Sequence, residues 1–380
     1  MKVLIACGGT GGHINPGLAI ADIIKSKYPD AEFLFAGTPK GMEAKLVPQA
    51  GYKLETIKVA GFQRKISLEN VGRNIKAAAY LATSGKRAKE IIEGFKPDIA
   101  IGTGGYAAGP VIRKAARMGI PTAIHEQNAY PGVTNKLLAK EVDYVMLTVI
   151  EALKFMDKDK FEYSVTGLPV RSNINTMSRA EARAKLGFND DFTILSFGGS
   201  LGAGCINETM TATIKWHVGE GLNINHIHGY GGMGKDTFPQ AMKAAGIPLK
   251  SDRLRITEYI NDMDVCLAAA DLVICRSGAS TLAELEAAGR GSILIPSPIV
   301  AGNHQYHNAM VLGKAGAAVV IEQKDMTNER MIAEIKKLYE APEKAAEMSG
   351  KAAGLCVKDT NERILAVIDK LLEKKKNGNR

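Results

Sequence analysis

The sequence lacks the usual signatures of a disulfide framework and of a bound metal. Its 380 residues include five cysteines, and none of them forms a C-x-x-C pair. An odd number of scattered cysteines is typical of a protein from a reducing compartment. There is no H-E-x-x-H motif, and a D-x-D triplet occurs in the charged segment 157–159 rather than after an apolar strand. We therefore expect no metal site.

Long hydrophobic runs are also absent. The apolar run at residues 2–7 is too short for a signal peptide. The longest stretch without Asp, Glu, Lys or Arg spans residues 291–313, but it contains two prolines and a run of Asn, His and Gln. Such a stretch does not form a membrane-spanning helix, so any membrane contact is expected to be peripheral.

The charge balance is basic, with a net charge of +9 and a sequence pI of about 9.1. This surplus favours acidic partners such as anionic lipids, phosphorylated substrates or nucleic acid, although an ordinary solvated surface explains it equally well. The length suggests two domains.

Short apolar runs alternate with helical patterns along the whole chain, which predicts parallel sheets covered on both faces. The first half predicts strands at 2–7, 32–36, 98–101, 122–125 and 144–147, and helices at 16–27, 68–83, 107–118 and 134–140. The second half predicts strands at 193–197, 224–228, 254–257, 272–275, 293–296 and 317–321, and helices at 206–218, 280–288, 306–314 and 361–374. The fold class is therefore α/β, with two doubly wound Rossmann-like domains joined by the Gly- and Pro-containing segment 167–171.

Each half begins with a strand that runs into a glycine loop, residues 8–12 in the first and residues 198–202 in the second. Glycines allow close approach of a ligand, and the helix behind such a loop offers unpaired amides to a phosphate. Two domains of this kind are expected to face a cleft that holds the substrates.

His13 directly follows the first loop. Imidazole titrates near neutral pH, which makes His13 a candidate general base, with a packing or capping histidine as the alternative.

The second loop matches G-x-S-x-G, so a serine hydrolase with Ser200 as nucleophile is a further alternative. The histidines available to it are His226, His228, His304 and His307. Residues 229–236 match G-x-G-x-x-G by letter, but they follow a second strand and precede Pro239, so we interpret them as a flexible loop.

Three polar stretches are candidates for substrate contacts. Residues 275–284 and 125–128 continue from predicted strands, and residues 303–308 open a predicted helix. Residues 275–284 place a helix N-terminus and Glu284 where a diphosphate and a ribose diol could bind, or they form a capping box. Residues 125–128 and 303–308 carry side chains suited to an N-acetyl sugar. Residues 61–76 mix apolar and basic side chains, which indicates either a contact with anionic lipid or an amphipathic helix packed on the sheet.

Taken together, these motifs resemble the MurG family, the UDP-N-acetylglucosamine transferases of glycosyltransferase family 28 that convert lipid I to lipid II. The resemblance rests on six motifs in order, at residues 8–13, 104–106, 125–128, 169–171, 198–200 and 276–284. It implies a glycosyltransferase B fold with an acceptor domain at 1–168, a donor domain at 169–355 and a C-terminal helix, within 356–380, that returns to the first domain. It implies inverting transfer of N-acetylglucosamine, with His13 as the base.

The resemblance also assigns binding residues. The donor-binding residues would be Thr10, Gly11, Gly12, Asn128, Arg171, Ser200, Ile260, Ala279, Ser280, Thr281, Leu282, Ala283, Glu284 and Gln305, the first three of which would also lie near the acceptor diphosphate. The acceptor-binding residues would be Gly104, Gly105, Tyr106, His125 and Glu126. The membrane contact would comprise Arg64, Lys65, Ile66, Leu68 and Ile75.

The resemblance further implies no tightly bound cofactor, although a divalent cation could stimulate the reaction. It implies a peripheral location at the cytoplasmic face of the bacterial membrane, no nucleic acid, and other cell-wall enzymes as further partners. Two positions depart from the family pattern: Leu201 stands where glutamine is common, and His304 precedes Gln305 where a second glutamine is common.

Overall fold

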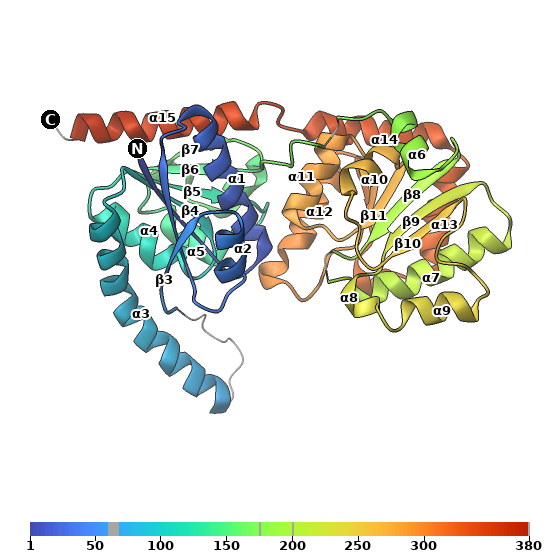
Figure 1. Cartoon of the computed structure of the whole chain (residues 1–380), viewed down its shortest axis with the longest axis horizontal. Helices are drawn as coiled ribbons and strands as arrows, with labels where there is room; N and C mark the ends of the chain where they lie inside the picture. Colours follow the sequence, from blue (N-terminus) through green and yellow to red (C-terminus); the bar gives the residue numbers. More distant parts are fainter. Residues whose placement is uncertain (60–67, 175, 200, 379–380) are drawn as a thin grey trace. The chain divides into compact units, whose positions relative to one another are not determined.

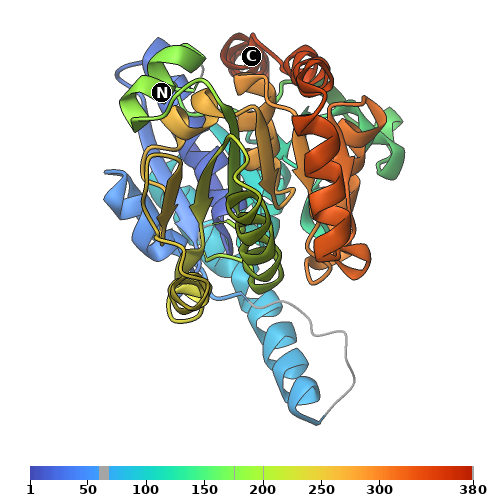
Figure 2. The ribbon, with the colours of Figure 1, turned by 90° about the vertical axis from the view of Figure 1, so that its right-hand side faces the viewer.

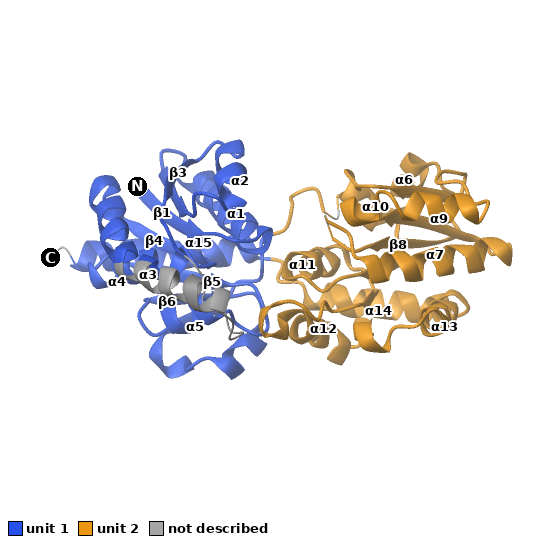
Figure 3. Cartoon of the chain, turned by 90° about the horizontal axis from the view of Figure 1, so that it is seen from below, with its two compact units in different colours: residues 1–169, 359–380 blue, residues 170–358 orange. Residues whose placement is uncertain are grey.

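A computed structural model describes residues 1–59, 68–174, 176–199 and 201–378, without the side chains of residues 68–79, 81 and 82. Within the described part of the chain, no helix is long and apolar enough to cross a membrane. The chain divides into two compact units, Met1–Pro169 with Asp359–Arg380, and Val170–Lys358 (Figure 3).

Unit 1 contains a parallel sheet in the order β3-β2-β1-β4-β5-β6-β7 (Figure 1). Its strands are β1 (Lys2–Cys7), β2 (Glu32–Gly37), β3 (Lys53–Thr56), β4 (Ile99–Gly104), β5 (Thr122–Glu126), β6 (Tyr144–Leu147) and β7 (Glu162–Val165). The strand order reverses direction between β1 and β4, and ligands of doubly wound sheets bind at this switch point.

Unit 2 contains a second parallel sheet in the order β10-β9-β8-β11-β12-β13, flanked by helices (Figure 2). Its strands are β8 (Phe192–Phe197), β9 (Ile224–Gly229), β10 (Leu254–Thr257), β11 (Leu272–Cys275), β12 (Ser292–Leu294) and β13 (Ala318–Val320). Its switch point lies between β8 and β11. The two doubly wound α/β sheets predicted from the sequence are thus confirmed.

The helices connect successive strands. In unit 1 they are α1 (Gly11–Lys27), α2 (Glu43–Gln49), α3 (Leu68–Phe95), α4 (Ala108–Arg117), α5 (Val133–Leu138), the 3₁₀ turns Ile150–Phe155 and Lys158–Lys160, and α15 (Thr360–Gly378). In unit 2 they are α6 (Arg179–Leu186), α7 (Gly204–Gly219), α8 (Gly231–Gly234), α9 (Phe238–Ala244), α10 (Met263–Ala269), α11 (Ala279–Ala288), α12 (His304–Lys314), α13 (Asn328–Tyr339), α14 (Pro342–Leu355), and the 3₁₀ turns Ala301–Asn303 and Gln323–Asp325.

The central strands form because their residues are apolar on both faces and are covered by helices on both sides. Ile5 of β1 is fully buried in one core cluster and its neighbour Leu4 in another. The same alternation separates Ile194 from Leu195 in β8. The edge strands β3 and β7 were not predicted, because they are polar and only partly buried and so lack an apolar run.

Helix α15 packs on unit 1 through one apolar face. Ile364, Val367, Ile368 and Leu371 join the core cluster of β1 and α1. Charged side chains fix the helix at its edges, where Lys375 pairs with Asp98.

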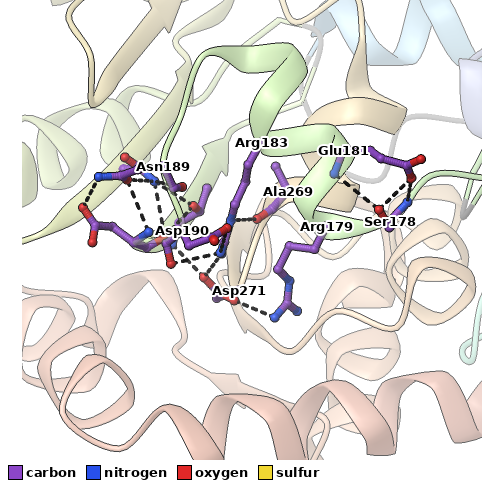
Figure 4. A network of polar contacts seen from close by, with 11 residues as sticks. Ser178, Arg179, Glu181, Arg183, Asn189, Asp190, Ala269 and Asp271 are labelled. Carbon is purple, nitrogen blue, oxygen red and sulfur yellow. Dashed lines mark hydrogen bonds and ion pairs between the residues drawn. The ribbon is translucent and has the colours of Figure 1, made fainter.

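In unit 2 a buried guanidinium anchors α6 beside α10 (Figure 4). Arg183 donates to the carbonyl oxygen of Ala269 at 3.3 Å and forms an ion pair with Asp271, which Arg179 also contacts. The helix begins with a capping box formed by Ser178 and Glu181. Asp271 also accepts from the amide of Thr193 in β8. These bonds therefore connect α6 to the first strand of the second sheet.

Candidate active site

In each unit the polar and glycine-rich segments follow the carboxyl ends of the central strands. Unit 1 places the loops after β1, β4 and β5 at one edge of its sheet. Unit 2 does the same with the loops after β8, β9, β10 and β11. Within a parallel sheet these ends coincide, so residues distant in sequence meet there.

The loop after β1 is held by a carboxylate that no sequence motif indicated. Glu43, the first residue of α2, is fully buried. Its Oε2 accepts from the amide of Gly9 at 3.1 Å, and its Oε1 accepts from the amide and hydroxyl of Thr38 at 2.8 and 2.6 Å. Burial alone would raise the pKa of Glu43, but the hydrogen bonds from Thr38 and Gly9 outweigh it and the pKa lies below its usual value.

Three glycines leave the space that this carboxylate occupies. A methyl group on Gly8 would lie 2.6 Å from Oε1 of Glu43, one on Gly41 would lie 2.2 Å from Oε2, and one on Gly37 would lie 2.5 Å from Cγ. The side chain of Glu43 therefore fits only because Gly8, Gly37 and Gly41 have no side chains.

His13 lies in the first turn of α1 and is partly exposed. Its Nδ1 is 3.1 Å from the carbonyl oxygen of Gly8. A carbonyl oxygen only accepts hydrogen bonds, so Nδ1 carries the proton and Nε2 of the neutral ring is an acceptor. The hydroxyl of Thr103 donates to the backbone oxygen of His13 at 2.7 Å, which fixes the start of the helix.

Gly104 and Gly105 allow the loop after β4 to pack against the first loop. A methyl group on Gly104 would lie 2.7 Å from Cδ2 of His13, and one on Gly105 would lie 2.1 Å from the carbonyl oxygen of Gly8. Both glycines also have positive φ values, 106° and 84°. The following Tyr106 is 59% exposed, so its ring is accessible to a ligand.

The polar run that begins with the last two residues of β5 is mostly buried. His125 is fully buried, its Nε2 is 3.0 Å from the carbonyl oxygen of Gly167, and burial lowers its pKa to about 4. Glu126 is 1% exposed and accepts from the amides of Asn128 and Gly132 and from the side chain of Asn135. These contacts assign His125 and Glu126 a role in shaping the loop, and their contact with an acceptor stays a prediction.

The second glycine loop interlocks with the segment after β9. A methyl group on Gly202 would lie 2.3 Å from the carbonyl oxygen of Tyr230, and one on Gly231 would lie 2.3 Å from the amide nitrogen of Gly202. Asn207 donates to that same carbonyl at 2.9 Å. The interpretation of residues 229–236 as a flexible loop is wrong: residues 231–234 form α8, because tight glycine packing fixes the backbone.

The segment after β11 begins a helix without a side-chain cap. Gly278 is the N-cap residue of α11, which excludes the predicted capping box of Ser280 or Thr281 with Glu284. Glu284 instead accepts from Nε of Arg171 at 2.8 Å. Two residues assigned to donor binding thus form an ion pair. The side chain of Glu284 is 18% exposed and that of Arg171 is 49% exposed.

Neither α1 nor α11 has an acidic residue in its first turn or a side-chain cap. By contrast, α6 and α13 begin with Ser178 and Thr327 as caps and Glu181 and Glu329 in the first turn. The N-terminal amides of a helix that lacks a side-chain cap are suited to an anion such as a diphosphate. Thr10, Gly11 and Gly12 in one unit, and residues 279–283 in the other, therefore lie at helix starts that are compatible with a phosphate. The starts of α4, α5, α7 and α12 share this feature, so it does not by itself identify a site.

Gln305 and Arg276 organise the neighbouring loops of unit 2. Oε1 of Gln305 accepts from the amide of Ser297 at 2.9 Å, and its backbone oxygen accepts from the hydroxyl of Ser277 at 2.8 Å. Arg276 donates to the carbonyl oxygen of Ile295 at 3.1 Å. Ile260, between β10 and α10, is 6% exposed and packs on Gly229, so its side chain is structural.

Three of the histidines considered for a serine hydrolase have partners within the described part of the chain. His226 and His228 are fully buried, and both contact the hydroxyl of Ser196 at 2.8 Å. His304 contacts the carbonyl oxygen of Ala301 at 2.8 Å. Ser200 itself lies outside the described residues, so the serine hydrolase alternative stays a prediction.

Some predicted residues lie outside what the structure describes. Ser200, Arg64, Lys65 and Ile66 fall in the gaps, and the side chains of Leu68 and Ile75 are not described. Among the described residues there is no group of three or more His, Cys, Asp or Glu that could hold a metal ion.

The chain matches two family models and a named relative over most of its length. Residues 3–147 match the glycosyltransferase family 28 N-terminal domain, and residues 193–364 match the family 28 C-terminal domain. A protein of Acetivibrio thermocellus, 45% identical with 100% of both chains covered, is named UDP-N-acetylglucosamine--N-acetylmuramyl-(pentapeptide) pyrophosphoryl-undecaprenol N-acetylglucosamine transferase.

Solved structures agree with this placement. The structure of Acinetobacter baumannii MurG is 28% identical and covers 97% of this chain and 99% of its own, with a TM-score of 0.78. A UDP-N-acetylglucosamine 2-epimerase is 14% identical, with 96% of this chain and 94% of its own covered and a TM-score of 0.59, which shows a shared fold only.

Proposed function

The chain belongs to glycosyltransferase family 28, and from this premise we propose that it transfers N-acetylglucosamine from UDP-N-acetylglucosamine to undecaprenyl-diphosphate-linked N-acetylmuramoyl-pentapeptide, giving lipid II and UDP for peptidoglycan synthesis. The observation that carries this proposal is the 45% identity, over the whole chain, to a relative named for that transfer.

The reaction is an inverting displacement at C1 of the donor sugar. The acceptor hydroxyl oxygen forms a bond to C1, the bond from C1 to the diphosphate oxygen breaks, and UDP leaves with the electron pair. The hydroxyl proton passes to Nε2 of His13, which the hydrogen bond at Nδ1 leaves as an acceptor.

Unit 2 supplies the groups that would hold the donor. The N-terminus of α11 and the guanidinium of Arg171 would stabilise the charge that develops on the leaving diphosphate. Glu284 would accept hydrogen bonds from the ribose diol, so its present bond to Arg171 would be shared or exchanged when the donor binds. Gln305 would contact the sugar, and the backbone of Ile260 would contact the uracil. The family resemblance adds Asn128, a residue of unit 1, to the sugar contacts.

Unit 1 supplies the groups that would hold the acceptor. The loop after β1 and the N-terminus of α1 suit its diphosphate, and the exposed ring of Tyr106 suits its sugar. We place the enzyme at the cytoplasmic face of the membrane, where the basic residues around 64–75 would contact anionic lipid, with other cell-wall enzymes as further partners. No tightly bound cofactor is required by this chemistry, although a divalent cation could assist departure of the diphosphate.

Incubation of the purified chain with labelled UDP-N-acetylglucosamine and lipid I tests the proposal. We expect a labelled disaccharide lipid and stoichiometric UDP. Transfer to a diacylglycerol instead would indicate another lipid glycosyltransferase, and UDP release with conversion of the sugar in the absence of acceptor would indicate an epimerase. Binding of UDP without any turnover would indicate a nucleotide-sugar-binding protein, and labelling of Ser200 by a fluorophosphonate would indicate a hydrolase.

A further inference from the structure

The buried carboxylate of Glu43 and the imidazole of His13 lie at the two ends of one peptide group. Glu43 accepts from the amide of Gly9 at 3.1 Å, and Nδ1 of His13 is 3.1 Å from the carbonyl oxygen of Gly8. That amide and that carbonyl belong to the same peptide bond between Gly8 and Gly9. A chain of three polar groups therefore runs from the carboxylate through the peptide to the ring.

We propose that Glu43 is a positioning residue that acts on His13 through the peptide group between Gly8 and Gly9. The negative charge polarises the amide, which makes the carbonyl of Gly8 a stronger hydrogen-bond acceptor. The stronger acceptor holds the proton on Nδ1 of His13 and keeps Nε2 directed away as a base. A carboxylate that acts on a histidine in this way serves the same purpose as the third member of a catalytic triad, with a peptide group in between.

The packing around Glu43 supports a role beyond stability. Three glycines leave the space for it, although an apolar residue would fill such a site at lower electrostatic cost. The hydroxyl and amide of Thr38 give the carboxylate two further donors, so it remains ionised while it accepts from Gly9. The same loop is fixed from its other side by Gly105, which contacts the carbonyl oxygen of Gly8.

The first test measures the imidazole of the wild-type protein directly. The protein is labelled with ¹⁵N-histidine, and His13 is assigned by comparison with His13→Ala. Well above neutral pH we expect long-range ¹H–¹⁵N spectra to show the tautomer protonated at Nδ1. A ring protonated at Nε2 would overturn the proposal. This measurement does not depend on the proposed function. The inference rests on the proposed function only in the kinetic tests that follow.

The second test uses Glu43→Gln, which keeps the shape of the side chain but removes its charge and one acceptor. We expect kcat for sugar transfer to fall about 10–100-fold, with the KM for the donor changed by less than about twofold. The population of the Nδ1 tautomer should fall in parallel. Unchanged kcat and tautomer in a folded Glu43→Gln protein would contradict the proposal.

A double-mutant cycle separates positioning from a general structural role. In the His13→Ala background, Glu43→Gln should lower the residual rate by less than about twofold, because the group through which it acts is gone. If Glu43→Gln lowered the rate by the same factor in the His13→Ala background as in the wild type, Glu43 would act independently of His13. If Glu43→Gln does not fold, Glu43→Asp, which retracts the charge by one methylene, takes its place in both measurements with the same expectations.

Asp143→Asn is the matched control. Asp143 also accepts a backbone amide, that of Thr122 at 2.8 Å, but it does so at the amino ends of β5 and β6. We expect this variant to lose stability without a change in kcat or in the tautomer of His13. If the wild-type chain transfers no sugar at all, the proposed function fails, while the tautomer measurements still decide what Glu43 does.

Discussion

The glycine loop after β1 and the glycine loop after β8 occupy the same topological position in their sheets, but different interactions hold them. In unit 1 a buried carboxylate, Glu43, accepts from the loop, and an imidazole binds its carbonyl. In unit 2 two glycines, Gly202 and Gly231, interlock backbone against backbone, with the neutral amide of Asn207 beside them. The comparison shows that the same loop position is held in two ways, by a buried carboxylate in unit 1 and by interlocking glycines in unit 2. Under the proposed function, the first loop would orient the reactive group and the second would provide a rigid binding surface.

The largest effect is expected when the reactive group is removed from the first loop. His13→Ala should lower kcat by about 10²–10⁴-fold, because the acceptor hydroxyl loses its base. The affinity for UDP, measured by calorimetry, should change by less than about twofold, since the groups that would hold UDP lie mainly in unit 2. Equal losses of turnover and of UDP affinity would remove the assignment of His13 as the base.

The interlocking of the second loop predicts a graded series of glycine substitutions. Gly202→Ala should destabilise unit 2 by about 3 kcal/mol or more, because it combines a φ of 83° with a methyl group 2.3 Å from a backbone oxygen. Gly199→Ala, with a φ of 92° but open space, should cost about 1–2 kcal/mol. Gly204→Ala, which has neither problem, should be neutral or slightly stabilising.

Trp216 is the only tryptophan of the chain and packs against the core of unit 2, so its fluorescence during urea denaturation reports on this unit. Equal stability losses at the three glycines would show that steric contact does not hold the second loop.

A smaller effect is expected from the donor residues of unit 2. Glu284→Gln should raise the KM for UDP-N-acetylglucosamine about 10-fold, because a charged hydrogen bond to a ribose hydroxyl becomes a neutral one. The value of kcat at saturating donor should change little. Glu340→Gln, at an exposed helix end, is the control and should change neither constant. A loss confined to kcat would place Glu284 in catalysis instead of donor binding.

The smallest effect concerns the dependence of stability on pH. This dependence is expected to be stronger in unit 2, which buries three histidines, than in unit 1, which buries one. Burial lowers the pKa of His217 to about 4 and that of His228 to about 3, and it lowers the pKa of His226 well below its usual value. The unfolded chain therefore binds protons that the folded chain does not, and stability falls as the pH drops below the unfolded value near 6.5.

His217→Gln tests this pH dependence, since it removes one of the three groups. Between about pH 7 and about pH 5.5, the variant should lose about 1 kcal/mol less stability than the wild type. The measurement is the urea midpoint from Trp216 fluorescence at both pH values. Identical losses in the two proteins would mean that His217 does not titrate on unfolding as its burial implies.

Much of the fold could be predicted from the sequence. The apolar runs predicted every central strand, and β1, β6, β10 and β11 have the predicted bounds. Edge strands β3 and β7 were not predicted, because their polar and partly buried residues carry a weak periodic signal. The helices α2, α6, α9, α10, α13 and α14 were not predicted either, although α13 has an apolar face formed by Met331, Ile335 and Leu338 that the sequence carries. The helix α1 begins at Gly11, before the predicted Pro16, since glycines were interpreted as loop residues.

The sequence by itself determined the alternation of strands and helices, the positions of the glycine loops and the identity of His13, because these depend on local patterns of apolar residues and on backbone freedom. Only the tertiary structure placed Glu43 beside Gly9, buried His125 and Glu126, and paired Arg171 with Glu284. A glutamate at the start of a helix has the sequence pattern of an exposed residue. It becomes a buried, ionised group here because parallel pairing of β1 with β2 brings a distant loop to within hydrogen-bonding distance of the first glycines.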